Sequence, residues 1–394
     1  MTRRLNAVAV CAILAVAGTS LAGCSIGKEK NEGDTNAAKG KNNVVKVVAT
    51  TTQICDYVTQ IASDKSADAT LAFTKMDSAG KVTHSGAAKD KAQSEIDLTC
   101  LLAPNASAHE HEMTTEQAKA LSAADVMLVS GVDLEHFLDS TVKATGFKGT
   151  MGVTTGILTA KEIDDEKSVL AQEKDLPYTI DRGVEKVKVE KWPFPPEDGE
   201  EPEFSYDPHV WTSPKNAAVQ VRNIGAILNK VSPENKELFT KHVEKYSAAL
   251  ADLDAWVKES IDSVAKEHRV LFTSHDAFGY FSKTYGIDFI GAALSDFNEQ
   301  QDATAKHIQE AAEEVKKSGA LALFAENSNN SKSIEAVAKA AGVKAVIGDD
   351  ALYGDSLGVV GSEGETYTGS ILHNVKTIVN AWSGHLAEIP ASLK

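Results

Sequence analysis

The sequence predicts an α/β protein of two lobes with mainly parallel sheets, joined by one long rigid helix. Three observations predict this fold. Strand-like and helix-like segments alternate along the chain, they fall into two blocks, and a long amphipathic segment separates the blocks. The chain has 394 residues, of which 42% are hydrophobic, so it is long enough to build more than one core.

Periodicity locates the individual elements. Short apolar runs predict strands at residues 44–50, 96–103, 125–130, 269–273, 287–292, 320–325 and 343–348. Apolar residues at three-and-four spacing predict helices at residues 115–123, 214–229, 303–317 and 331–341. We therefore expect an N-terminal lobe over residues 44–232 and a C-terminal lobe over residues 267–394. Two polar stretches without a clear period, near residues 76–95 and 161–206, are interpreted as surface insertions.

The segment 233–266 is predicted to form the linking helix. Ser232 can cap it, and Pro233 suits its first turn. A helix of this length extends roughly 45–50 Å, enough to connect two lobes and to resist bending between them. Its apolar residues follow helical spacing throughout: Phe239, Val243, Tyr246, Leu250, Leu253, Val257, Ile261 and Val264.

The N-terminus has the pattern of an export signal. Arg3 and Arg4 precede an apolar run too short to span a bilayer, and Leu-Ala-Gly-Cys follows at residues 21–24. This ending resembles a bacterial lipobox, which implies a signal peptide over residues 1–23 and lipidation of Cys24. An ordinary signal peptide with an incidental cysteine is the alternative. Residues 24–43 are polar and predict a disordered tether, so we expect an extracytoplasmic protein anchored to the cell membrane by lipid.

Charge and cysteine content narrow the class of partner and the compartment. The net charge is −16, and it becomes −18 once Arg3 and Arg4 leave with the signal. Such acidity argues against nucleic acid as a partner. Cys11 also leaves with the signal, so Cys55 and Cys100 remain beside the lipidated Cys24. In an oxidising exterior these two could pair, although two buried thiols are the alternative.

Three histidines stand apart from the rest by their position. His109 follows a predicted strand, His209 precedes a predicted helix, and His275 lies where a strand runs into a helix. Each of them falls at the carboxyl end of a strand or in the loop beyond it, and in open α/β sheets ligands bind at that edge. Neutral imidazole is a common ligand of transition metals. The sequence therefore indicates a metal site. Most other histidines are interpreted as structural or solvated: His84, His136, His242, His268, His307, His373 and His385.

A carboxylate from the C-terminal lobe is expected to complete this site. Asp355 is the candidate, in Leu-Tyr-Gly-Asp-Ser-Leu beyond the last predicted strand, and Asp349 and Asp350 compete with it. The position of Asp355 beside a glycine fits either a turn aspartate or a metal ligand. Glu326 also ends a predicted strand at this edge, where it could orient a ligand or simply cap a helix.

Four motifs make the sequence resemble a known family. They are Asp-Pro-His-Val-Trp at 207–211, Ser-His-Asp-Ala-Phe-Gly-Tyr-Phe at 274–281, Tyr-Gly-Asp-Ser-Leu at 353–357, and Tyr-Thr-Gly-Ser-Ile-Leu-His-Asn at 367–374. They resemble the cluster A-I metal-binding proteins of ABC importers, a family of zinc and manganese receptors. The resemblance implies that His109, His209, His275 and Asp355 bind the metal. Where the family usually has Asp-Pro-His, this chain has Ser-Ala-His-Glu-His, so His111 stays an alternative to His109.

The resemblance also implies the function. We expect a monomeric solute-binding protein that captures a divalent metal ion between its lobes and delivers it to a membrane permease with a cytoplasmic ATPase. Three imidazoles and one carboxylate favour zinc, with manganese second. A closed four-ligand site needs no catalytic water, and we expect no enzymatic activity. The alternatives from other classes are a secreted zinc-dependent enzyme and a surface adhesin.

Overall fold

The computed structural model describes residues 43–109, 111–194, 204–290 and 305–394. The predicted signal peptide, Cys24 and the tether up to residue 42 lie outside these ranges. Within them, no helix combines the length and the apolar character that crossing a membrane requires.

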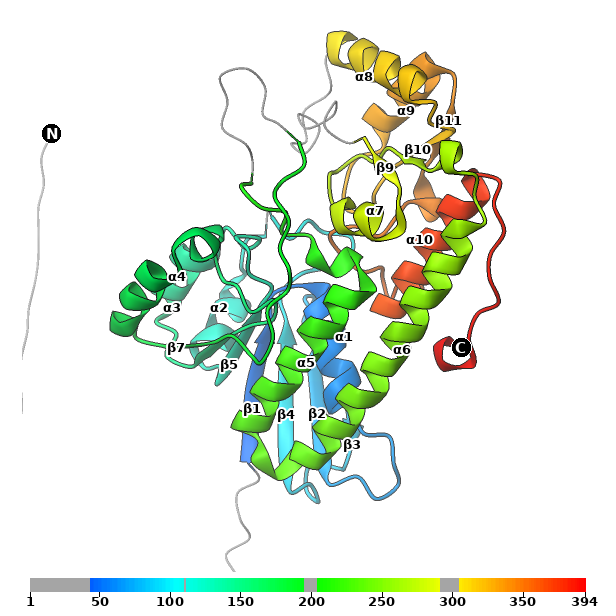
Figure 1. Ribbon diagram of the computed structural model, residues 1–394. Coiled ribbons are helices and arrows are strands. Elements are labelled where there is room, and N and C mark those ends of the chain that lie inside the picture. The colour runs from blue at the N-terminus through cyan, green and yellow to red at the C-terminus, as the bar shows by residue number, and fades with distance from the viewer. Residues whose placement is uncertain (1–42, 110, 195–203, 291–304) are drawn as a thin grey trace, which may run out of the picture. The chain divides into compact units, whose positions relative to one another are not determined.

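The N-terminal lobe is built on one seven-stranded sheet (Figure 1). Its strands follow the order β3-β2-β4-β1-β5-β6-β7. All neighbours pair in parallel except β2 and β3, which form an antiparallel hairpin. The strands are β1 (Asn43–Ala49), β2 (Leu71–Met76), β3 (Val82–Gly86), β4 (Ser94–Cys100), β5 (Val126–Val129), β6 (Thr150–Val153) and β7 (Thr179–Asp181).

Helices cover both faces of this sheet. Successive residues of a strand point to opposite faces, and in β5 Val126 and Leu128 join one core while Met127 and Val129 join another. The first core receives α1 (Thr52–Ala62) and α5 (Pro214–Val231), and the second receives α2 (Thr115–Ser122) and α3 (Leu138–Thr145). A parallel strand buried on both faces reads as an apolar run, which is why the sequence predicted β1, β4 and β5. Strands β2 and β6 of the same sheet were not predicted.

The structure differs from the sequence analysis in the two segments interpreted as surface insertions. Between residues 76 and 95 the chain forms β3 and enters β4, and between residues 161 and 206 it forms α4 (Ala160–Gln172) and β7. Strand β3 is almost entirely exposed and joins the sheet through its backbone. A short polar strand of this kind carries no apolar period, so the pattern could not reveal it.

The long helix contacts both lobes. A 3-10 turn, η3 (Pro233–Asn235), leads into α6 (Lys236–Asp262). Helix α6 packs against α5 and α1 of the N-terminal lobe and against α7 (Gly279–Tyr285) and α10 (Tyr367–Ala381) further along the chain. Figure 1 shows α6 running beside α5 and then beside α10. The helix ends at Asp262 and not near residue 266, because η4 (Lys266–His268) turns the chain into the next strand.

The C-terminal lobe has short parallel strands. Strand β8 (Val270–Leu271) pairs with β9 (Asp288–Phe289), and β10 (Ala322–Phe324) pairs with β11 (Lys344–Val346). A bridge between Thr273 and Phe324 connects the two pairs. Helices α8 (Ala305–Ser318) and α9 (Lys332–Ala341) complete the lobe around a core of its own. The predicted fold of two α/β lobes with mainly parallel sheets and one long connecting helix is confirmed.

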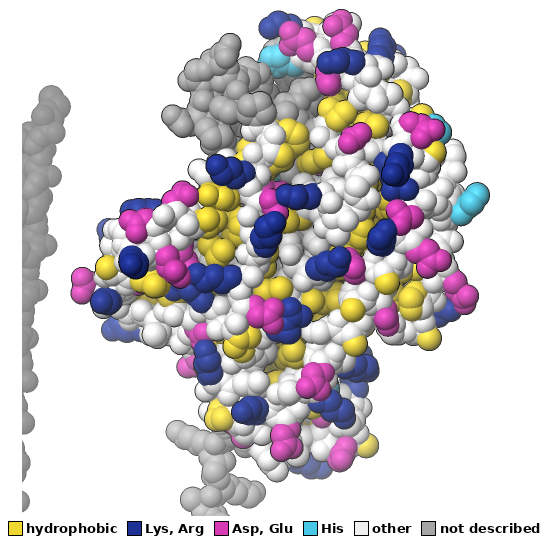
Figure 2. Space-filling model, in the orientation of Figure 1, with side chains coloured by type: hydrophobic (Ala, Val, Ile, Leu, Met, Phe, Trp, Pro, Cys, Tyr) yellow, Lys and Arg dark blue, Asp and Glu magenta, His cyan; other side chains and the backbone are white. Residues whose placement is uncertain are grey.

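Acidic and basic side chains are interspersed on the surface. Figure 2 shows this mixture over the visible face, with apolar atoms between the charges. The net charge of −16 is therefore not gathered into one patch on that face.

Candidate metal centre

Each predicted histidine is fixed by hydrogen bonds local to its own turn. His109 lies in the loop after β4, where its backbone N–H donates to the Ser107 hydroxyl at 3.2 Å. His209 directly precedes the 3-10 turn η2 (Val210–Thr212) and α5. His275 lies beyond β8, and its carbonyl accepts from the Thr273 hydroxyl at 2.6 Å.

The fold brings these three histidines and Asp355 together. One ligand atom from each of the four lies within 4.8 Å of all the others. The Nε2 atom of His209 lies 3.1 Å from Nε2 of His109 and 3.2 Å from Nε2 of His275. The Asp355 carboxylate lies 3.3 Å from His275, 3.6 Å from His109 and 3.7 Å from His209. Three imidazole nitrogens and one carboxylate facing a common point are a donor set suited to a transition-metal ion.

Burial determines the charge state of the cluster. His209 is completely buried, and His109 is the most exposed member with 10% of its side chain accessible. Burial lowers the pKa of His109 to about 3, although Asp355 opposes the shift. Burial disfavours ionisation of Asp355 too, yet the surrounding histidines hold its pKa well below the ordinary value. A neutral His109 imidazole beside the Asp355 carboxylate is ready to bind a cation.

Two side chains next to the cluster orient its members. Nδ1 of His209 lies 2.8 Å from Oδ1 of Asp207, which leaves Nε2 directed at the cluster. The Ser107 hydroxyl donates to Oδ2 of Asp355 at 3.0 Å. Such partners fix the tautomer and direction of metal-binding side chains.

The loop that carries Asp355 is held by the N-terminal lobe. The indole N–H of Trp211 donates to the Gly354 carbonyl at 3.0 Å, and the Gln53 amide donates to the Asp355 carbonyl at 3.1 Å. The Leu357 N–H donates to the Thr52 hydroxyl at 2.8 Å. Sequence reasoning missed these roles. Trp211 belongs to a motif that it noted, but no local signal at Gln53 points to a partner about 300 residues away.

The competing candidates lie elsewhere. The ring of His111 packs against Phe137, with 5.2 Å between centroids, and His111 is not part of the cluster. Asp349 and Asp350 are exposed in the 3-10 turn η6 (Gly348–Asp350). The cluster therefore contains His109 and Asp355 and neither of their rivals.

Glu326 lies beside the cluster without joining it. Its side chain is buried, with 1% of the residue exposed, and its carboxylate contacts Gly354, where a Cβ would collide with Oε2. Burial raises the pKa of Glu326 well above its ordinary value, with Asp355 and Asp276 adding to the shift and His275 opposing it. A neutral carboxyl group under the Asp355 loop fits this position.

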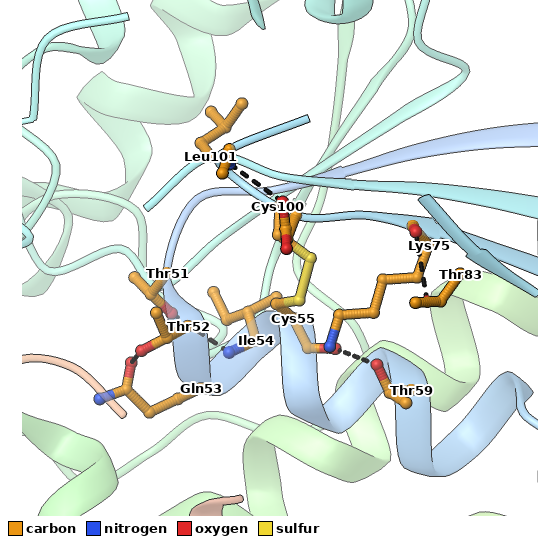
Figure 3. The surroundings of a disulfide bond; sticks show 12 residues. Thr51, Thr52, Gln53, Ile54, Cys55, Thr59, Lys75, Thr83, Cys100 and Leu101 are labelled. Atoms are coloured by element: carbon orange, nitrogen blue, oxygen red, sulfur yellow. Dashed lines mark hydrogen bonds between the residues drawn. A yellow bond between two sulfur atoms is a disulfide. The ribbon is translucent and has the colours of Figure 1, made fainter. Parts of the chain in front are cut away.

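Cys55 and Cys100 are joined by a disulfide in the structure. Figure 3 shows the bond between α1 and the end of β4. Both residues are buried, and the Thr59 hydroxyl donates to the Cys55 carbonyl at 2.8 Å. The bond thus connects the helix that carries Gln53 to the strand that leads to His109.

This fold and this donor set define a two-lobed α/β binding protein with a site suited to a divalent metal ion. The chain belongs to the family described as zinc-uptake complex component A, periplasmic, whose model matches residues 86–381. The resemblance to the metal-binding components of ABC importers is thereby confirmed.

Individual relatives agree with this assignment. The chain is 30% identical to the zinc-binding protein TroA of Treponema pallidum over 298 residues, covering 75% of this chain and 84% of TroA. It is 28% identical to the manganese-binding lipoprotein MntA of Bacillus subtilis over 352 residues, which cover 89% of this chain and 93% of MntA. It is also 25% identical to PsaA of Streptococcus pneumoniae, a manganese ABC transporter substrate-binding lipoprotein. This match extends over 366 residues and covers 93% of this chain and 96% of PsaA.

A solved structure of TroA matches the fold. The TM-score is 0.60 at 26% identity, and the match covers 87% of this chain and 99% of TroA. The names of these relatives refer to zinc, manganese or transport, and give no support to the enzyme or adhesin alternatives.

Proposed function

We propose that this protein captures a divalent transition-metal ion with His109, His209, His275 and Asp355 and delivers it to an ABC permease. The observation that carries the proposal is the convergence of four ligand atoms within 4.8 Å in a buried site. The first two ligands come from the N-terminal lobe and the last two from the C-terminal lobe, so a bound ion would connect the lobes directly.

Zinc is the proposed cargo, with manganese second. Three imidazoles and one carboxylate match the closed tetrahedral sites that zinc favours. The Irving–Williams order also places zinc above manganese at a site with three nitrogen donors. TroA is named for zinc, whereas MntA and PsaA are named for manganese, so the family contains both kinds.

Release requires the Asp355 loop to withdraw from the ion. Trp211 and Gln53 donate to the carbonyls of Gly354 and Asp355, so the N-terminal lobe holds this loop through two hydrogen bonds. Helix α6 contacts both lobes and limits their relative rotation. We therefore expect metal-free and loaded forms to differ in the C-terminal lobe around Asp355, and a permease that pulls this loop away would free the ion.

Glu326 is proposed to support the same loop. Its carboxyl group is buried against Gly354, one residue before Asp355. It therefore acts on the metal through the position of Asp355 and does not bind the ion itself.

The protein is proposed to act outside the cytoplasm as a monomer anchored through Cys24. The basic residues Arg3 and Arg4, the short apolar run and the Leu-Ala-Gly-Cys ending support export and lipidation. MntA and PsaA are named as lipoproteins. The membrane partner would be a permease with its cytoplasmic ATPase.

Two measurements test this function. Metal analysis of the protein purified from its own host should find about one zinc ion per chain, the capacity of one four-ligand site, and the Asp355→Ala variant should lose it. Cells that lack the protein should take up less metal, and the wild-type gene, but not Asp355→Ala, should restore uptake. Normal uptake in cells without the protein would contradict delivery even if the purified protein binds zinc.

A further inference from the structure

His136 lies immediately outside the four-residue cluster. Its ring centroid is 6.2 Å from that of His109. Within the cluster, the histidine centroids are separated by 5.2, 5.3 and 5.0 Å. A fourth imidazole therefore lies only about one ångström farther from His109 than the cluster histidines do.

One ion can bridge rings at this separation. With a zinc–nitrogen bond of about 2.1 Å and a ring radius of about 1.1 Å, two centroids around a shared ion lie about 5.2 Å apart at a tetrahedral angle and at most about 6.4 Å apart in a linear arrangement. The separation of 6.2 Å between His109 and His136 falls within this limit. A shared tetrahedral ion would therefore require the two rings to approach each other by about 1 Å.

The backbone holds His136 at this position by an unusual turn. After β5 the chain adopts positive φ at three consecutive residues, with φ of 92° at Gly131, 56° at Val132 and 58° at Asp133. Valine is β-branched and rarely adopts such a φ, so the surrounding structure must impose it. The Val132 N–H donates to the Ile157 carbonyl at 3.0 Å, and the buried Glu135 carboxylate accepts from the Ser130 and Gly131 N–H groups. His136 follows directly and is exposed.

His109 is the cluster member best able to move toward His136. Nδ1 of His209 is held by Asp207, whereas Nδ1 of His109 is buried and has no hydrogen-bond partner among the described residues. A metal-binding histidine normally has such a partner to fix its ring. His109 is also the most exposed of the four cluster side chains.

Phe204 packs against both rings and lines the space beside them. Its centroid is 5.4 Å from His109 and 5.6 Å from His136. One apolar ring therefore lies against both imidazoles.

We propose that His136 and His109 form an outer metal station, through which the ion reaches and leaves the four-ligand site. The proposal rests on the proposed function, since it assumes that His109 belongs to the final site. An ion would first bind the exposed His136, then be shared with His109, and then pass to His209, His275 and Asp355 as it sheds its waters. His136 is not a ligand of the stored ion.

The test measures the rates of loading and release. Metal-free protein is mixed with Co²⁺ in a stopped-flow instrument, and the visible absorption of four-coordinate Co²⁺ reports filling of the inner site. Excess EDTA then measures release. His136→Phe keeps an aromatic ring against Phe204 but removes the metal-binding nitrogens. His136→Cys supplies a different metal donor at the same position. His385→Phe is the control, because it makes the same substitution at an exposed histidine elsewhere.

For His136→Phe we expect both rate constants to fall about tenfold, as the loss of about 1.4 kcal/mol of stabilisation along the path would produce. Their ratio should change far less than either rate. His136→Cys should recover much of the wild-type speed, and His385→Phe should match the wild type.

Three results would overturn the station. Wild-type rates in His136→Phe would show that the ion does not pass through this residue. Faster release at an unchanged loading rate would show that His136 supports the final site instead, and failure of His136→Cys to recover speed would assign the effect to packing. If the wild type itself binds no Co²⁺ or Zn²⁺ stoichiometrically, the proposed function fails and the station fails with it.

Discussion

Asp207 and His209 lie two residues apart and are bound to each other twice. Oδ1 of Asp207 accepts the backbone N–H of His209 at 2.9 Å and lies 2.8 Å from Nδ1 of the same residue. Because the imidazole N–H donates at Nδ1, Nε2 carries the lone pair and faces the cluster. The Asp-Pro-His sequence thus contains both a proposed ligand and the group that orients it.

Removing this carboxylate should weaken metal binding without removing a ligand. We expect Asp207→Asn to reduce zinc affinity by about 10–100-fold, the usual effect of losing a partner that orients a metal-binding histidine. Competition with a chromophoric chelator measures the affinity. Asp288→Asn, at an exposed position, is the control. Equal affinities for the two variants would mean that Asp207 does not orient His209.

His109 and His111 should respond differently to substitution. His109→Ala removes a member of the cluster and should cost more than about 100-fold in zinc affinity, beyond the effect of losing an orienting partner. His111→Ala changes a ring that packs on Phe137 and should retain one zinc ion per chain. Metal content after dialysis distinguishes the two. Stoichiometric zinc in His109→Ala would instead assign the ligand to His111.

His109 should make the metal-free protein less stable in mild acid. Burial lowers the pKa of His109 from 6.5 to about 3. Between these values the unfolded chain binds a proton at His109 and the folded chain does not. The contribution of His109 to the free energy of unfolding therefore falls as the pH drops below 6.5, while the raised pKa of Glu326 acts in the opposite direction.

Urea unfolding of the metal-free protein between pH 7.5 and pH 5 measures this dependence. The His109→Asn variant should show a shallower slope over the same range, because it lacks the group. The depressed pKa of Asp355 acts in the same direction but only below its ordinary value of 3.8, so it does not contribute in this window. A slope unchanged by His109→Asn would contradict the assignment.

Reduction of the Cys55–Cys100 disulfide should destabilise the protein. The bond closes a loop with a sequence separation of 45. By the chain-entropy relation its loss costs about 4 kcal/mol. The urea midpoint of the wild type should fall in the presence of dithiothreitol. The double variant with Cys55→Ser and Cys100→Ser should unfold at the midpoint of the reduced wild type, whether or not dithiothreitol is present. Thiol titration confirms reduction, and an unchanged midpoint with both thiols free would refute the expected contribution.

Glu326 should tolerate loss of its charge better than loss of its volume. Burial raises the pKa of Glu326 and so favours its neutral form, and Glu326→Gln supplies a neutral group of similar size. Glu326→Ala leaves a void beneath Gly354 and should lower both the thermal midpoint and the zinc affinity. Parallel melting and zinc titrations compare the two variants. Equal damage from both would show that an ionised carboxylate is required.

Local patterns in the sequence predicted most of the architecture. The central strands and the long helix follow from apolar periodicity, since burial of one or both faces leaves a regular pattern. Strands β2, β3, β6 and β7 were not predicted, and β3 and β7 carry no buried side chains, so they leave no apolar pattern. Helix α6 was predicted in the right place but about four residues too long at its C-terminus.

The sequence by itself determined the class of fold, the family, and the short motifs that contain His209, His275 and Asp355, because each of these depends on neighbouring residues. Only the tertiary structure decided which side chains meet. It brings His109 and not His111 to the cluster, selects Asp355 over Asp349 and Asp350, and joins Gln53 to a loop about 300 residues away. Such contacts depend on how two lobes pack, and no local pattern records the distance between residues that are far apart in the chain.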